Sequence, residues 1–148
     1  MRVSAAALVG VFVLLATACG GRGEARLSKQ EFQTQANAIC AKYDKQLKAI
    51  GSPTSIEEIP DLVDQALVIL DKEIDEVSAL NPPEELQSDF DKMLAATDRT
   101  KAAAADLSEA AKAGDQAAVQ KALEEGNAAS NDADELAANL GLGDCNSS

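Results

Sequence analysis

The sequence predicts an all-α protein, an antiparallel up-down four-helix bundle with a disulfide-stapled C-terminal tail. Two observations support this fold class. Apolar residues recur at spacings of three and four along four segments, which short stretches containing glycine or proline separate. Aromatic residues make up only 3% of the chain against 46% apolar residues, so the core must be built from aliphatic side chains and close helix contact. The expected helices cover residues 29–50, 56–80, 83–112 and 115–140.

The first two helices are indicated by their caps and their apolar stripes. Ser28 and Glu31 have the spacing of a capping box, and the first helix ends at Gly51. The second segment tolerates Pro60 near its first turn and is the most strongly apolar of the four. The two stripes are Phe32, Ala36, Ile39, Tyr43, Leu47 and Ile50, then Ile59, Val63, Ala66, Leu70, Ile74 and Val77.

The last two helices form a second predicted hairpin. Pro82 and Pro83 break the chain before the third helix, whose first turn carries acidic residues, as the helix dipole favours. Gly114 and Asp115 are a C-terminal glycine followed by an N-cap acid, which predicts a tight turn and antiparallel neighbours. Short turns throughout favour an up-down-up-down order.

The start of the chain is typical of an export signal. Met1-Arg2 precedes an apolar run over residues 3–15, which as a helix reaches only about 20 Å and is too short for a permanent membrane span. Residues 1–18 are therefore predicted to be a removed signal peptide. Cleavage leaves either an ordinary secreted chain, since Ala16-Thr17-Ala18 fits small-x-small cleavage, or a lipoprotein beginning at Cys19.

The cysteine count favours the lipoprotein. LLATAC resembles the bacterial lipobox, although Ala16 stands where an aliphatic residue is usual. The chain has three cysteines, and thiols of exported proteins tend to pair. A bridge between Cys40 and Cys145 leaves Cys19 for diacylation. We therefore expect lipidation (palmitate or a similar chain) at Cys19, a tether over residues 19–27 and a bundle domain over residues 28–148, held at the extracytoplasmic face of the cell membrane.

The predicted bridge requires the C-terminal tail to reverse at Gly141. The fourth helix should end beside the start of the first, whereas Cys40 lies about 18 Å along it, so residues 142–145 would have to run extended along the bundle. The closed loop spans 105 positions, corresponding to about 4 to 5 kcal/mol in the chain-entropy model.

Composition narrows the functional classes. The chain contains no histidine, which removes the usual proton shuttle and the commonest metal ligand, and its formal charge of −12 disfavours nucleic-acid partners. No acidic pair, nucleophile motif or phosphate-binding loop is indicated by spacing. We expect no catalytic residue, no metal site and no cofactor.

One candidate ligand site remains, a groove between the third and fourth helices. Small residues would face one another there and either pack closely or leave space for a small apolar ligand. Its residues are Thr97, Thr100, Ala104, Ala122, Gly126 and Ala129.

The lipobox, the Leu80-Asn81-Pro82-Pro83 turn and the terminal Gly143-Asp144-Cys145 together resemble small lipoproteins and secreted helical proteins of high-GC Gram-positive bacteria. The resemblance implies no activity. The leading hypothesis is a lipid-anchored, non-catalytic binding or interaction module whose protein or small-ligand partner is unknown. The alternatives are a carrier of a small apolar or cationic ligand and a freely secreted helical protein.

Overall fold

The computed structural model describes residues 25–146 and confirms the four-helix fold. The helices are α1 (Lys29–Ile50), α2 (Ile59–Ser78), α3 (Glu84–Ala113) and α4 (Gln116–Leu140), and residues 25–146 contain no β-strand. Two 3₁₀ turns flank them, η1 (Ile56–Glu58) before α2 and η2 (Gly143–Cys145) after α4. The predicted signal segment, Cys19 and most of the predicted tether lie outside the described residues.

The helix ends follow the local sequence closely. Ser28 Oγ accepts from the Glu31 amide at 3.3 Å while Glu31 Oε2 accepts from the Ser28 amide at 3.0 Å, which is the predicted capping box. Asp115 accepts from two amides of the first turn of α4. Gly114 ends α3 with φ of 67°, a left-handed conformation that favours glycine. The second segment differs from expectation only at its ends, because residues 56–58 form η1 and the α-helix stops at Ser78.

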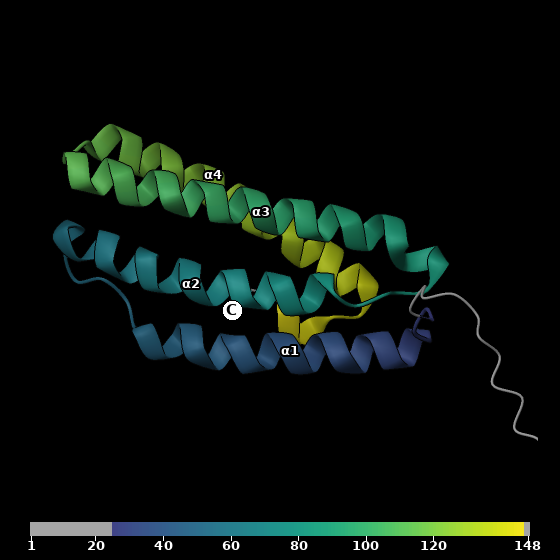
Figure 1. Ribbon diagram of the computed structural model, residues 1–148. Helices are drawn as coiled ribbons and strands as arrows, with labels where there is room; N and C mark the ends of the chain where they lie inside the picture. Colours follow the sequence, from purple (N-terminus) through teal and green to yellow (C-terminus); the bar gives the residue numbers. More distant parts are fainter. Residues whose placement is uncertain (1–24, 147–148) are drawn as a thin grey trace, which may run out of the picture.

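The four helices alternate in direction and form two hairpins, α1–α2 and α3–α4 (Figure 1). The closest packing is between α3 and α4, and α2 joins the hairpins by packing on α3. Helix α1 contacts α2 and the tail segment η2. The tail therefore closes the side of the bundle where α4 and α1 would otherwise meet along their length.

The hydrophobic core is divided between the two ends of the bundle. The larger cluster lies where α1 begins and α4 ends, and there Phe32 and Phe90 pack edge to face with ring centroids 5.2 Å apart. A smaller cluster at the other end contains Ala110, Ala111 and Val119. Although α2 is the most apolar helix in sequence, Val77 is its only buried residue within the described chain. The middle of α2 consequently borders an incompletely filled space.

None of the helices in the described part of the chain combines the length and hydropathy needed to span a bilayer.

Candidate functional site

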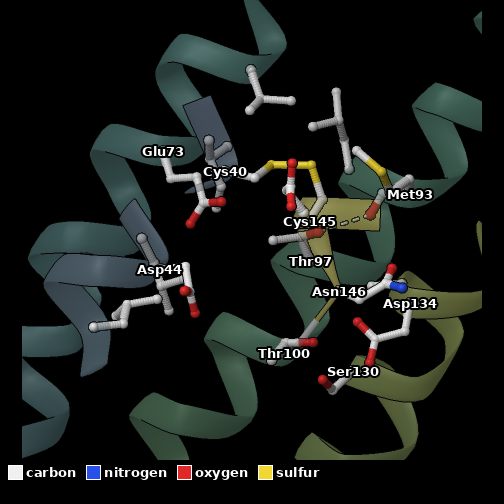
Figure 2. Close-up of a pocket in the computed structure, with 17 residues that line it drawn as sticks. Cys40, Asp44, Glu73, Met93, Thr97, Thr100, Ser130, Asp134, Cys145 and Asn146 are labelled. Carbon is white, nitrogen blue, oxygen red and sulfur yellow. Dashed lines mark hydrogen bonds between the residues drawn. A yellow bond between two sulfur atoms is a disulfide. The ribbon is translucent and has the colours of Figure 1, made fainter. Parts of the chain in front are cut away.

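A cavity of about 160 Å³ lies in the middle of the bundle, between the two hairpins (Figure 2). All four helices and the C-terminal tail contribute to its wall. Most of the wall surface is apolar, and the disulfide of Cys40 with Cys145 forms part of it. The aliphatic and thioether side chains that line it are Leu47, Leu70, Ile74, Val77, Met93, Leu94 and Ala133.

Polar groups line the cavity on two sides. Asp44 and Glu73 come from the first hairpin, and Thr97, Thr100, Ser130 and Asp134 come from the second (Figure 2). Asp144 and Asn146 of the tail complete the polar lining. Within residues 25–146 no lysine or arginine lines the cavity, so all its charged lining groups are carboxylates. This arrangement gives the cavity a negative potential inside a largely apolar wall.

The hydroxyl groups of the two threonines are hydrogen-bonded within α3. Thr97 Oγ1 donates to the Met93 carbonyl at 3.0 Å, and Thr100 Oγ1 donates to the Ala96 carbonyl at 3.2 Å. Such bonds to the carbonyl four residues earlier use the hydroxyl proton and leave the oxygen as an acceptor. Both threonines can therefore accept a hydrogen bond from a ligand without losing their backbone contact.

Glu73 contributes a carboxyl group with a raised pKa to the cavity lining. Its carboxyl is half-buried and has no hydrogen-bond or ion-pair partner in the described part of the chain. Burial and, to a lesser extent, the negative charge of Asp44 together raise the pKa of Glu73 to about 7. Asp44 itself is paired with Lys48, whose Nζ lies 3.0 Å from its Oδ2. Near neutral pH, Glu73 is therefore partly protonated, and a positive charge placed beside it would favour loss of the proton.

The predicted bridge between Cys40 and Cys145 is confirmed, with Cα atoms 4.9 Å apart. The chain reverses at Gly141, whose φ is 78° and against which the Gln33 side chain packs. Three hydrogen bonds fix the tail to α1: Gln33 Nε2 to the Leu140 carbonyl (2.7 Å), Asn37 Nδ2 to the Gly141 carbonyl (3.2 Å) and the Asp144 amide to Asn37 Oδ1 (2.9 Å).

The path of the tail differs from the expected extended run. Residues 143–145 form the 3₁₀ turn η2 instead. The reason is the register of the helices, because the Leu140 carbonyl already lies at Gln33, one turn into α1. The distance from Gln33 to Cys40 along the axis of α1 is about 10 Å by helical rise, and a compact turn can span it.

The predicted groove between α3 and α4 is only partly included in this cavity. Thr97 and Thr100 line it, whereas Ala104, Ala122, Gly126 and Ala129 do not. Ala122 and Ala129 are buried, and a Cβ on Gly126 would meet the Ala103 Cβ at 3.5 Å, an ordinary contact distance. The small residues thus bring α3 and α4 close together. The open space lies on another face of α3, toward α1 and α2.

The sequence did not reveal that the first hairpin, α1–α2, contributes to the wall of the cavity. Leu70 and Ile74 belong to an apolar stripe and were expected in the core, while neither Glu73 nor Asp44 was predicted to be a site residue. One signal was available, since each of these acids is adjacent to a stripe residue, Ile74 and Tyr43 respectively. An acid at the border of a stripe is half-buried wherever the stripe faces an incompletely packed core.

The carboxylates of the described chain do not form a metal centre. No group of three or more Cys, Asp or Glu side chains within residues 25–146 is arranged to hold a metal ion.

Comparisons of the chain with protein-family models, curated proteins and solved structures find no match. Function therefore has to be inferred from the residues of the cavity and from the start of the sequence.

Proposed function

We propose that the protein is a non-catalytic binding module that holds a small, largely apolar ligand in the cavity between its hairpins. The observation that carries the proposal is the cavity itself, mostly apolar and lined by all four helices and the tail. An apolar cavity of about 150 Å³ in a protein core is large enough to bind benzene. At about 160 Å³, this cavity fits a single ring or a short branched alkyl group.

The chemistry of the lining supports binding rather than catalysis. Cys40 and Cys145 are joined to each other, and the Thr97 and Thr100 hydroxyls donate to backbone carbonyls instead of to a base. Histidine, the most common general base, is absent from the sequence.

Binding can be tested with toluene, an apolar probe of one ring. We suggest the full chain carrying Cys19→Ala, so that no acyl chain competes for the cavity, prepared under oxidising conditions that allow the bridge to form. Saturating toluene should shift the amide NMR signals of the lining residues and raise the melting temperature. Ala133→Leu fills the cavity and should abolish the response, while Ala138→Leu makes the same change on an exposed face of α4 and should preserve it. An unchanged spectrum of the parent protein at saturation overturns the proposal.

We also propose that lipidated Cys19 anchors this module to the outer face of the cell membrane. The lipobox-like LLATAC sequence supports this, as does the bridge that occupies the other two cysteines. The resemblance to small lipoproteins of high-GC Gram-positive bacteria points the same way.

An anchor at Cys19 would reach the bundle through the first described residues. The Arg26 guanidinium donates to the Pro82 carbonyl at 2.8 Å, and the Leu27 amide donates to the Asn81 carbonyl at 2.8 Å. The chain is thus fixed to the α2–α3 turn from Arg26 onward, and the seven residues after Cys19 can span at most about 25 Å. The end of the bundle that carries this turn would face the membrane.

The anchor is tested by metabolic labelling with a clickable fatty acid in an actinobacterial host. The parent protein should take up label and sediment with membranes, and Cys19→Ala should do neither. An unlabelled parent protein, or label that persists in Cys19→Ala, would contradict the anchor without affecting the cavity.

A further inference from the structure

We propose that the ligand of the cavity is a small organic cation, an apolar group carrying an ammonium that binds the Glu73 carboxylate. This inference rests on the proposed binding function and adds the chemical class of the ligand. The cavity combines a largely apolar wall with charged groups that are all negative. Such a site is complementary to a molecule that is apolar at one end and positive at the other.

None of the elements around the cavity contributes a positively charged residue to its lining. Asp44 of α1, Glu73 of α2, Asp134 of α4 and Asp144 of the tail are acidic, and the lining residues of α3 are uncharged. Lys48 lies outside the lining, and its Nζ pairs with Asp44 Oδ2 at 3.0 Å. An anionic ligand would therefore meet only like charge within the lining.

Glu73 is the group in this set best suited to receive an ammonium. Asp44 has Lys48, and Asp134 also takes part in an interaction within the structure. Glu73 has no such partner, although its burial disfavours an isolated charge. An ammonium beside it would supply the missing counter-charge and donate a charge-assisted hydrogen bond. The apolar part of the ligand would then extend over Leu70, Ile74 and Met93, which line the same space.

Charge neutralisation also links binding to pH. Because the pKa of Glu73 is about 7 in the free protein, a bound ammonium must displace its proton at lower pH. Affinity for the cation should therefore fall as the solution is acidified, by up to about a hundredfold between pH 8 and pH 5. A neutral ligand displaces no proton and should bind equally well across this range.

Three probes that share one benzene ring and differ in charge test the inference: benzylamine as the cation, toluene as the neutral molecule and benzoate as the anion. Dissociation constants are measured at pH 8 and pH 5 by NMR titration of the full chain carrying Cys19→Ala. At pH 8 benzylamine should bind about ten- to a hundredfold more tightly than toluene. Benzoate should bind more weakly than toluene.

Matched variants assign the effect to Glu73. Glu73→Gln should reduce benzylamine binding to the level of toluene binding in the same variant and remove its pH dependence, and unchanged amide NMR signals of residues away from the cavity show that the variant is folded. Asp75→Asn removes one negative charge from an exposed position on the same helix and should retain the preference for benzylamine.

The outcomes separate the two proposals. If no probe binds, the binding function itself is wrong. If toluene binds but benzylamine binds no more tightly, or if Glu73→Gln retains the preference for the cation, the cavity is a binding site and its assignment to an organic cation is overturned.

Discussion

Replacing Glu73 with glutamine should stabilise the ligand-free protein at alkaline pH and have progressively less effect as the pH falls. The two side chains have nearly the same shape, and glutamine cannot ionise. In the folded protein the carboxyl stays protonated up to about pH 7, whereas a glutamate in the unfolded chain ionises near pH 4.5. The folded state therefore loses stability as the pH rises from about 4.5 to about 7, the interval in which the glutamate ionises in the unfolded chain and stays protonated in the folded one.

The size of this loss of stability follows from the difference between these two pKa values. A shift from 4.5 to about 7 corresponds to an upper limit of about 3 kcal/mol. Because the side chain is only half-buried, solvent screening reduces this value, and we expect about 1 to 2 kcal/mol. The stability associated with the protonated group is complete below pH 4.5 and is lost as the pH rises through 7. The advantage of Glu73→Gln over the parent protein should develop across the same interval.

Urea unfolding followed by circular dichroism at 222 nm measures this difference at unit steps from pH 4 to pH 8. Glu76→Gln is a control of opposite sign on the same helix. Hydrogen bonds from Lys42 and Tyr43 lower the pKa of Glu76, so its replacement should destabilise the protein at neutral pH, and this loss should shrink as the pH falls through the acidic range. A stability difference between Glu73→Gln and the parent protein that does not change with pH would refute the reasoning.

Three further substitutions test the packing. Cys40→Ser opens a loop of 105 positions and should lower the free energy of unfolding by about 4 to 5 kcal/mol without altering localisation; equal melting temperatures of variant and parent under oxidising conditions would contradict this. Leu142→Ala removes a fully buried side chain of the tail and should cost about 2 to 5 kcal/mol in urea unfolding, and a loss below 1 kcal/mol would show that the tail is not part of the core. Ser108→Ala should be neutral or stabilising by up to about 1 kcal/mol, because this buried hydroxyl has no hydrogen-bond partner within the described chain. Clear destabilisation of Ser108→Ala in the same assay would indicate a partner for that hydroxyl.

The elements best predicted from sequence are those determined by local interactions. The capping box of Ser28, the N-cap at Asp115 and the left-handed glycines at 114 and 141 each depend on residues within one turn of themselves. The bridge between Cys40 and Cys145 was also predictable, because a chain with three cysteines has few ways to pair them.

The cavity was not predictable, because it depends on the relative placement of two hairpins. Periodicity shows which face of α2 is apolar, and it cannot show that Leu70 and Ile74 are only partly covered. The same limit applies to Glu73, which is half-buried where the neighbouring elements surround the cavity. At Gly126 the sequence left two alternatives, a groove or close packing, and only the distance to Ala103 distinguishes them.

The position of the disulfide makes the molecule a covalent ring. All three connections between helices, residues 51–58, 79–83 and 114–115, lie between Cys40 and Cys145 in the chain. A protease that cuts any one of them opens the ring without releasing a fragment, because the two pieces remain joined through sulfur. A singly nicked molecule would thus migrate as one species on a non-reducing gel and as two on a reducing gel. The bundle can lose the continuity of its backbone at any single turn and still keep α1 attached to the other three helices.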